Sequence, residues 1–510
     1  MRRQEVSAEG FFAAAARTAD RPAAILGDSG EGISFVDLAA RSADLAGRLR
    51  YDLAEGDRVA ILLKNDLDYF VAAWAARRSG LRYVPINWHL QPAETAYIIE
   101  NSEARAVVSS IGLGALARAA TETTARSALM LSMDAPFGAF RSIADVPGLP
   151  SFEGREGSAM MYSSGTTGTP KGILRPLGTQ PVGAPGPGEL LMRHAYGVGA
   201  DSVFLAPGPL YHAAPLAWTM GTQVLGGTSV VLSSFDAEAV LAAIERFRVT
   251  HALFVPTHFV RMLKLPEAVR RRYDLSSLKA AIHAAAPCPP EVKRRMIEWL
   301  GPVIEEFYGA SEGGFVTVSS SEWLERPGTV GRSMAGPIRI LDDDGRDLPR
   351  GTKGVVYFQM SMPFEYYKEP DKTGEAIRDG QWCTAGDIGY LDEDDFLFLV
   401  DRKSNMIISG GVNIYPQEVE SLLALHPLVE DLAVIGIPNA EFGEEVKAVV
   451  ALARGQAPSQ ALAEELIAYC RARLAHYKCP RSVDFVAEIP RLPSGKVRKQ
   501  ALLERYRETA

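Results

Sequence analysis

The clearest chemical pattern in the sequence is a run of glycine, serine and threonine that ends in a lysine, at residues 162–172. It follows the short apolar stretch Ala159-Met160-Met161, so we expect it to leave a strand as a loop. Glycines let a backbone approach an anion, hydroxyl and amide groups donate hydrogen bonds to phosphate oxygens, and Lys171 adds a positive charge. The order differs from the common nucleoside-triphosphate loop, because the lysine follows Pro170 and no Ser or Thr comes after it. The run predicts a phosphate-binding loop, and a flexible linker of the same composition is the alternative.

Six further short motifs follow the loop along the chain. They are Pro209-Leu210-Tyr211-His212, Ala284-Ala285-Ala286-Pro287, Tyr308-Gly309-Ala310-Ser311-Glu312, Gly386-Asp387, Asp401-Arg402-Lys403 and Pro493-Ser494-Gly495-Lys496. In composition and order, the seven motifs resemble those of the adenylate-forming enzymes, which include acyl-CoA synthetases, luciferases and peptide-synthetase adenylation domains. The resemblance spans nearly the whole chain and is closest to the AMP-forming acyl-CoA synthetases of the fatty acid–CoA ligase type.

The resemblance implies a nucleotide site. Tyr308 would stack on adenine, with the turn at residues 285–287 on the other face, and an aromatic ring suits a purine. Asp387 would accept hydrogen bonds from the ribose hydroxyls, and Arg402 would strengthen this binding of the ribose. A core tyrosine, an acidic turn residue and an exposed arginine are the alternatives at these three positions. The implied ATP- or AMP-binding residues are Ser163, Ser164, Gly165, Thr166, Thr167, Gly168, Lys171, Ala285, Ala286, Pro287, Phe307, Tyr308, Gly309, Ser311, Asp387 and Arg402.

Three residues are implied to be catalytic: Lys496, His212 and Glu312. Lys496 would bridge the substrate carboxylate and the α-phosphate, because two anions must approach each other and a fixed cation lowers that barrier. Glu312 and Thr167 would bind Mg²⁺, which prefers hard oxygen ligands. His212 would lie near the reacting carboxylate and gate the adenylate for thiol attack. The alternatives are a solvated basic tail, a surface glutamate and a structural histidine.

The implied reaction has two steps and uses ATP, Mg²⁺ and coenzyme A. An acid reacts with ATP to give an acyl-adenylate and pyrophosphate, and the acyl group then passes to coenzyme A. Asp401 matches the hinge about which the small C-terminal domain of these enzymes rotates between the steps. Ser409, Gly410 and Gly411 match the loop presented to coenzyme A, with an ordinary turn as the alternative. This implies an adenylation domain over residues 1–400 and a C-terminal domain over residues 401–510.

Residues at a few positions limit the class of carboxylic acid that we expect as the substrate. An amino-acid adenylation domain would carry an aspartate near Tyr211-His212-Ala213-Ala214, and none is present, which disfavours amino acids. The expected acyl pocket comprises His212, Trp218, Ala284 and Gly309. It favours a hydrophobic carboxylic acid of the fatty, aromatic, cyclic or sterol-side-chain kind, although a tryptophan at helical spacing is more often part of a core. A carrier-protein thiol as acceptor, a luciferase-like oxidation and a non-catalytic nucleotide-binding protein are the alternative functions.

These residues need a framework of strands and helices to position them. Ser34 can cap a helix over residues 35–50, residues 58–63 are typical of a strand buried on both faces, and Pro92 opens a helix. The alternation continues to a helix that begins at Pro290 and favours a parallel, helix-covered sheet. From about Asp342, Asp-Gly turns predict short antiparallel strands. We therefore expect an α/β fold with a large N-terminal domain of mostly parallel sheets, a small β-barrel-like subdomain and a small mobile α+β C-terminal domain.

The composition of the chain indicates the broad class of protein to which it belongs. The 510 residues carry a formal net charge of −8, which argues against general nucleic-acid binding, and their number argues for two or more domains. Four cysteines without metal-site spacing favour a reducing compartment, and no run approaches the roughly 20 apolar residues of a membrane helix. We expect a cytoplasmic enzyme whose partners are a small-molecule carboxylic acid, ATP and coenzyme A. A peripheral membrane contact and a homo-oligomer are left open.

Overall fold

The largest sheet of the protein has nine strands, in the order β17-β16-β15-β14-β13-β11-β12-β1-β2. The computed structural model describes residues 10–17, 20–125, 127–149, 154–163, 170–439, 441–491 and 497–507. The six strands from β15 to β1 in this order run parallel to one another. The strands are β1 (Pro22–Leu26), β2 (Gly32–Ser34), β11 (Val203–Ala206), β12 (Thr228–Val231), β13 (His251–Phe254), β14 (Ala280–His283), β15 (Ile304–Tyr308), β16 (Val316–Val318) and β17 (Arg332–Ser333).

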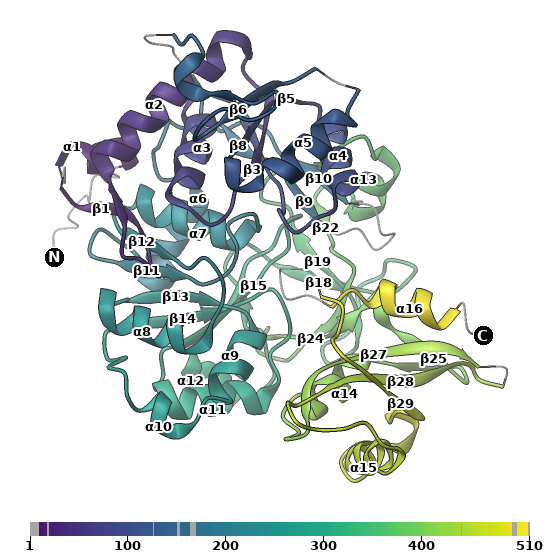
Figure 1. The fold of residues 1–510 in the computed structure, drawn as a ribbon. Helices are drawn as coiled ribbons and strands as arrows, with labels where there is room; N and C mark the ends of the chain where they lie inside the picture. Colours follow the sequence, from purple (N-terminus) through teal and green to yellow (C-terminus); the bar gives the residue numbers. More distant parts are fainter. Residues whose placement is uncertain are drawn as a thin grey trace.

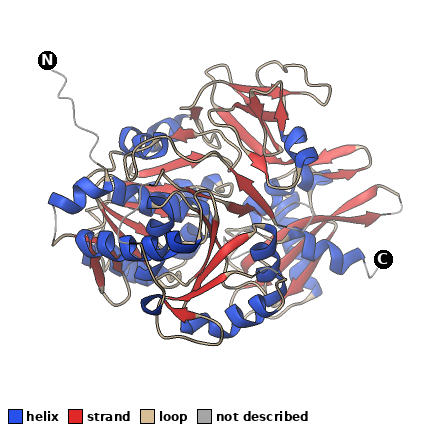
Figure 2. Cartoon of the chain, turned by 90° about the horizontal axis from the view of Figure 1, so that it is seen from above, coloured by secondary structure: helices blue, strands red, loops and turns tan. Residues whose placement is uncertain are grey.

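Helices cover this sheet, as its buried parallel strands require. Residues of α8 (Ala237–Phe247), α9 (Pro256–Leu263) and α11 (Pro290–Leu300) share one apolar cluster with alternate residues of the strands. Residues of α7 (Ala213–Val224) join a second cluster, which continues into the next sheet. Figure 2, which colours helices and strands separately, shows helices packed around the strands of this large body.

A second sheet of six strands, β7-β6-β5-β3-β4-β8, is parallel throughout. Its inner strands are β3 (Arg58–Leu62), β4 (Arg82–Pro85), β5 (Ala104–Ser109) and β6 (Leu129–Ser132), and its edge strands are β7 (Arg141–Ser142) and β8 (Ser158–Ala159). The expected helices precede or connect its central strands in the chain. Ser34 caps α2 (Phe35–Asp52) by accepting a 3.0 Å hydrogen bond from the Asp37 amide, and Pro92 is the first residue of α4 (Pro92–Asn101). The helix α3 (Leu67–Arg78) lies between β3 and β4 in the chain.

Two smaller sheets follow. The strands β9 (Met161–Ser163), β10 (Lys171–Leu174) and β20 (Glu365–Tyr366) form an antiparallel sheet, in which β10 is central. An antiparallel sheet of six strands contains β18 (Ile338–Leu341), β19 (Gly354–Gln359), β21 (Ile377–Arg378), β22 (Trp382–Cys383), β23 (Asp387–Leu391) and β24 (Leu397–Arg402). This sheet stands where the Asp-Gly turns predict antiparallel strands.

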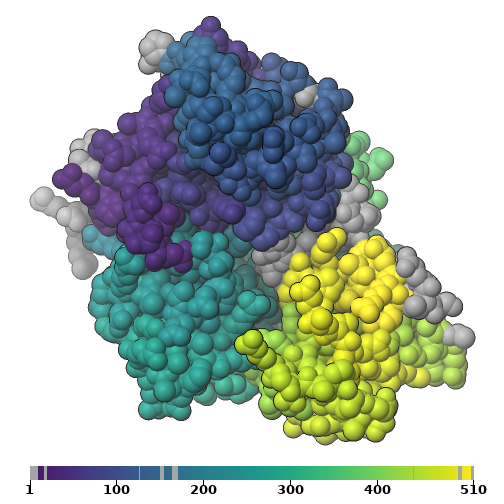
Figure 3. All heavy atoms as spheres, in the orientation of Figure 1, coloured from purple at the N-terminus to yellow at the C-terminus, as the bar shows by residue number. Residues whose placement is uncertain are grey.

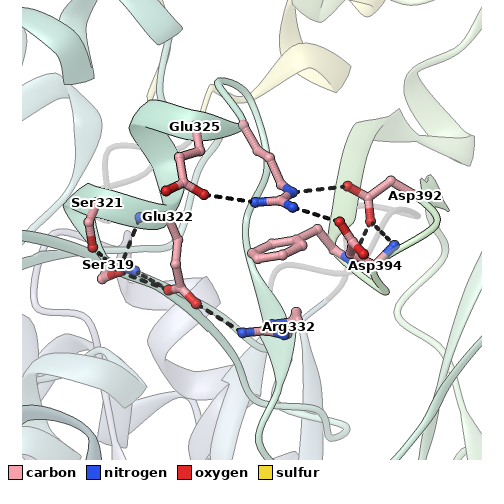
Figure 4. A network of polar contacts seen from close by, with 9 residues as sticks. Ser319, Ser321, Glu322, Glu325, Arg332, Asp392 and Asp394 are labelled. Atoms are coloured by element: carbon pink, nitrogen blue, oxygen red, sulfur yellow. Dashed lines mark hydrogen bonds and ion pairs between the residues drawn. The ribbon is translucent and has the colours of Figure 1, made fainter.

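A network of charged side chains links this antiparallel sheet to the nine-stranded one (Figure 4). The Arg326 guanidinium follows α12 (Ser320–Glu325) and contacts Glu325 at 3.2 Å, Asp394 at 2.6 Å and Asp392 at 3.6 Å. It also lies 4.4 Å from the centre of the Phe396 ring. The two aspartates belong to the turn between β23 and β24, so the network fixes that hairpin against α12.

The C-terminal part forms its own five-stranded sheet, seen in yellow-green at the lower right of Figure 1. Its strands are β25 (Ile407–Ser409), β26 (Val412–Ile414), β27 (Val429–Asn439), β28 (Gly443–Leu452) and β29 (Ser482–Val486), with helices α14 (Pro416–Leu423), α15 (Gln460–Arg471) and α16 (Lys499–Arg507). This sheet and its helices have apolar clusters of their own. We call this part the C-terminal unit.

The expected fold class is confirmed: parallel, helix-covered sheets form a large N-terminal part, and a small α+β unit follows. The domain boundary between residues 400 and 401 stays a prediction. Among the described residues, no helix combines the length and the apolar character that crossing a membrane requires.

Candidate functional site

Tyr308, Asp387 and Arg402 meet at the junction of two sheets. Tyr308 is the last residue of β15, while Asp387 begins β23 and pairs in register with Arg402, the last residue of β24. The Tyr308 hydroxyl donates to Asp387 Oδ2 at 2.5 Å, and Arg402 Nε donates to Oδ1 at 3.2 Å. Burial, and next the negative charge of Asp387, raises the pKa of the Tyr308 hydroxyl, so that it remains a donor. Each carboxylate oxygen can accept a second hydrogen bond, so Asp387 retains capacity for ribose hydroxyls.

Glu312 and Lys171 also come together, although 141 positions separate them (312 − 171). The strand β20 pairs with β10, which begins at Lys171, and it carries Tyr366 between the two. The Tyr366 hydroxyl donates to Glu312 Oε1 at 2.6 Å, and Lys171 Nζ lies 5.2 Å from the centre of the Tyr366 ring. Burial, and next the charge of Glu312, raises the pKa of Tyr366. Sequence reasoning missed Tyr366, because its role depends on strand pairing.

The chemistry at Glu312 suits a magnesium ion. Mg²⁺ is held by one or two carboxylates together with substrate phosphates, rather than by a full protein cage. The described part of the chain contains no group of three or more His, Cys, Asp or Glu residues able to hold a metal ion. Arg175, a second residue that sequence reasoning missed, positions this segment by donating from Nη2 to the Ser311 carbonyl at 2.7 Å.

The turn at residues 284–287 follows β14 directly. Ala284 is buried, whereas Ala285, Ala286 and Pro287 are exposed, as the wall of an open site would be. Ala285 has a φ of 74°, in the left-handed region that favours glycine. This conformation redirects the chain at the point where the adenine-contacting turn is expected.

The segment after Tyr308 requires glycine for a packing reason. A Cβ on Gly309 would lie 2.7 Å from the Gly314 carbonyl oxygen, closer than any real Cβ contact allows. Ala310 and Gly313 exchange backbone hydrogen bonds and close the turn. The glycine predicted for the nucleotide and acyl sites is therefore also needed by the turn that carries Ser311.

Aromatic rings define the expected acyl side. His212 stands at the N-terminal cap position of α7, and Trp218 lies one and a half turns into that helix. The Trp218 ring stacks on Phe307 with centroids 5.2 Å apart, and Phe307 stacks on Phe315 at 5.3 Å. Trp218 is buried in the core cluster, while Phe307 and Phe315 are only half-buried. Trp218 is thus the buried end of a row of three stacked rings, Trp218, Phe307 and Phe315. Phe315 is a candidate lining residue of the acyl pocket that sequence reasoning missed.

Asn65 holds the segment that precedes His212. Its side chain accepts from the Leu210 amide at 2.8 Å and donates to the carbonyl oxygens of Gly208 at 3.3 Å and Leu232 at 2.9 Å. One amide thus joins the loop after β3 to the loop after β11. The sequence shows no signal for this role, since the partners lie more than 140 positions away.

The expected hinge lies in β24, just before the C-terminal unit, and the expected coenzyme A loop lies at the start of that unit. Asp401 accepts hydrogen bonds from the Arg402 amide, the Asn405 side chain and the Gln417 amide. Ser409, Gly410 and Gly411 form the turn between β25 and β26, and both glycines have positive φ, at 58° and 79°. This turn needs glycine for its conformation.

Several predicted residues fall outside the described part of the chain. They are Ser164, Gly165, Thr166, Thr167, Gly168 and Lys496, and the side chain of Ser163 is likewise not described. The backbone of Ser163 ends β9 and pairs with Lys171. The two ends of the phosphate loop are thus adjacent strands, as a strand-to-loop exit predicts.

Comparison with known proteins identifies the family of the chain. The family model described as "AMP-binding enzyme" matches residues 11–367, and that described as "AMP-binding enzyme C-terminal domain" matches residues 418–496. A feruloyl-CoA synthase of Amycolatopsis sp is 34% identical over 94% of each chain, and a long-chain-fatty-acid–CoA ligase of Mycobacterium tuberculosis is 31% identical over 92% of each. The structure of an amide bond synthetase from Marinactinospora thermotolerans has a TM-score of 0.79 at 30% identity, over 94% of this chain and 96% of that one.

Proposed function

Because this chain belongs to the AMP-binding enzyme family of AMP-forming acid–thiol ligases, we propose that it activates a hydrophobic carboxylic acid with ATP and passes the acyl group to coenzyme A. In the first step, a carboxylate oxygen attacks the α-phosphorus of ATP, and the bond to pyrophosphate breaks. In the second step, the thiolate of coenzyme A attacks the acyl carbonyl, and AMP leaves. Adenylation therefore supplies the leaving group that thioester formation needs.

The aromatic row of Trp218, Phe307 and Phe315 is the observation that supports a hydrophobic acid as the substrate. The three rings stack in sequence, and Phe307 directly precedes Tyr308, the proposed adenine platform, on β15, so the two side chains point to opposite faces of that strand. Half-buried aromatic rings at that position favour an apolar or aromatic acyl group over a charged one. Two similar proteins are named for ferulate and for long-chain fatty acids, both of which have an extensive apolar part.

The charged groups around the row have separate proposed roles. Asp387, held by Tyr308 and Arg402, accepts the ribose hydroxyls. Lys171 attracts the nucleotide phosphates by its positive charge. Glu312 holds Mg²⁺, which supplies positive charge to the nucleotide phosphates when bound. Lys496 bridges the carboxylate and the α-phosphate.

A panel of acids with ATP, Mg²⁺ and coenzyme A tests the proposed substrate class. Pyrophosphate and thioester are measured separately for aromatic, long-chain, short-chain and amino acids. We expect aromatic or long-chain acids to give the highest kcat/KM. Preferential activation of amino acids or short charged acids would contradict the proposed acyl side, and thioester formation only on a carrier protein would contradict coenzyme A as the acceptor.

The role of Lys496 is tested by separating the two steps. We expect Lys496→Ala to reduce acid-dependent ATP–pyrophosphate exchange by at least about a hundredfold, since a fixed cation is lost from the first transition state. Thioester formation from supplied acyl-adenylate should remain close to wild type. Arg498→Ala, an exposed cation of the same basic tail, is the matched control and should change neither step. Equal loss of both steps in Lys496→Ala would disprove a role confined to adenylation.

A further inference from the structure

One lysine joins the large N-terminal part to the C-terminal unit. Lys264 directly follows α9, and its ammonium group donates to the carbonyl oxygens of Val429 and Glu430, both at 3.2 Å, and to Glu430 Oε2 at 3.3 Å. A lysine ammonium has three protons, so two consecutive residues across the contact supply a full set of acceptors. Figure 1 shows α9 facing α14 and β27 of the C-terminal unit.

The acceptor side is built by a β-bulge. Val429 pairs with Leu452 and Asp431 with Ala451, so Glu430 is an extra residue in β27. In a regular strand, consecutive carbonyls point to opposite edges, and one ammonium could not reach both. A bulge bends the strand and re-aims its groups, so both carbonyls are available to Lys264.

The turn before the bulge is held in place by its own hydrogen bonds. The Val429 amide donates to the His426 carbonyl at 3.0 Å, and the Ala453 amide donates to the Leu428 carbonyl at 3.0 Å. His426 Nδ1 accepts from the Leu428 amide at 3.4 Å. The acceptors for Lys264 are thus presented by an ordered segment.

Apolar contact accompanies the polar one but leaves space. Leu425 packs against the cluster that contains residues of α8, α9 and α11. Beside it lies a crevice of about 180 Å³, lined from both sides by residues that include Val260, Leu263, Arg295 and Pro427. An interface with such an open crevice is not packed like a core, and contacts of this kind between domains can separate.

The contact between Lys264 and Glu430 is weak enough to break and re-form. The side chains of Lys264 and Glu430 are 35% and 51% exposed, so water and salt screen their attraction. In this orientation, the glycines of the turn proposed to face coenzyme A, Gly410 and Gly411, are exposed, and so is Val412. The large N-terminal part therefore does not cover this turn when Lys264 is engaged, as we expect of an orientation that does not present the turn to the acyl group.

We propose that Lys264 is an interdomain latch, a positioning residue that favours the orientation of the C-terminal unit used for adenylation. The expected effect of the latch on the two half-reactions rests on the proposed function. The latch itself rests on the Lys264 contacts and the Glu430 bulge. Release of the latch lets the C-terminal unit move to the orientation that forms the thioester.

Distances between spin labels test the latch without reference to any acid. Ile111 in the large part and Tyr477 in the C-terminal unit are 57% and 56% exposed, and both are replaced by labelled cysteines. The background carries Cys288→Ala, because the other three cysteines are buried. We expect Lys264→Met to raise the population of a second distance about tenfold over wild type. Lys264→Arg should retain the wild-type distribution, as should Lys279→Met, which removes an exposed cation at the start of β14.

The two half-reactions supply the functional test. Lys264→Met should slow ATP–pyrophosphate exchange and speed thioester formation from supplied acyl-adenylate, each by about three- to tenfold. Salt at 0.5 M should act in the same directions on wild type and have little further effect on Lys264→Met.

The outcomes separate the latch from the proposed function. An unchanged distance distribution in Lys264→Met, or the same change in Lys279→Met, overturns the latch. Parallel loss of both half-reactions in Lys264→Met also overturns it, since that is the signature of general damage. A shifted distance distribution in a chain that activates no acid supports the latch and overturns the proposed function.

Discussion

At the scale of single residues, two tyrosine hydroxyls orient two carboxylates of the candidate site. Tyr308 donates to Asp387, and Tyr366 donates to Glu312. Hydrogen bonds to a charged acceptor contribute about 1.5–3 kcal/mol, so each pair fixes its carboxylate rotamer firmly. The hydroxyl of Tyr308 thus binds Asp387, while its ring is the proposed platform for adenine, so the two parts of the side chain can be tested separately.

Tyr308→Phe separates these roles. The ring is retained, while Asp387 loses its 2.5 Å donor. We expect the KM for ATP to rise about tenfold, with kcat for adenylation at saturating ATP within about threefold of wild type. Steady-state pyrophosphate release measures both constants. Tyr390→Phe, on the same strand β23 as Asp387, is the control and should leave KM unchanged. An unchanged KM in Tyr308→Phe would show that its hydroxyl does not support nucleotide binding.

The resemblance of short motifs implied site roles for Tyr308, Glu312, Asp387 and Arg402, and the structure places these residues in two neighbouring clusters. Tyr366, Arg175 and Asn65 could not be predicted, because each acts on a partner 54 to 145 positions away. A sequence shows side-chain chemistry along the chain, whereas such partners become visible only when strand pairing is known.

At the scale of elements, local signals predicted the helices and the parallel strands. Ser34 caps α2 and Pro92 begins α4, because both effects depend on a few adjacent residues. The pairing of β10 with β20 was not predictable, since β20 comes from residues 365–366, far along the chain. That pairing is nevertheless what carries Tyr366 to Glu312.

The turn after β14 stores backbone strain at Ala285, whose φ of 74° costs a non-glycine residue about 1–2 kcal/mol. Ala285→Gly should therefore stabilise the protein by about 0.5–1 kcal/mol, after the greater flexibility of glycine in the unfolded chain is subtracted. Urea unfolding measures the change. Ala286→Gly, at the adjacent exposed position without a positive φ, should be neutral or destabilising by up to about 1 kcal/mol. Equal effects of the two substitutions would mean that the φ angle carries no strain.

At the scale of the whole molecule, alternating strands and helices predicted the two-part fold, but not the contact between its parts. Lys264 and Glu430 are 166 positions apart, and neither belongs to a motif. Their contact also depends on the bulge in β27, which shifts the register after Val429. The domain orientation is therefore a property of the assembled chain rather than of any segment.

The nine-stranded sheet contains charges that link global stability to pH. On β15, Glu306 is buried and binds Lys293 at 2.6 Å, and its neighbour Glu305 is half-buried. Burial raises the pKa of Glu305 to about 7 from an ordinary 4.5, against a smaller lowering by Lys293. A carboxyl whose pKa is raised by folding stabilises the native state below its unfolded pKa, and that contribution is lost as the pH rises to about 7.

Glu305→Gln should remove this dependence, because an amide has no proton to lose. The free energy of unfolding of the variant minus that of wild type should be smallest near pH 4.5, grow as the pH rises toward 7, and level off above it. Urea unfolding at half-unit steps from pH 4.5 to 8.5 measures this difference, and the value at pH 4.5 is the internal reference for any effect of the amide itself. A difference that stays constant, or that grows toward acid pH, would show that folding does not raise the pKa of Glu305.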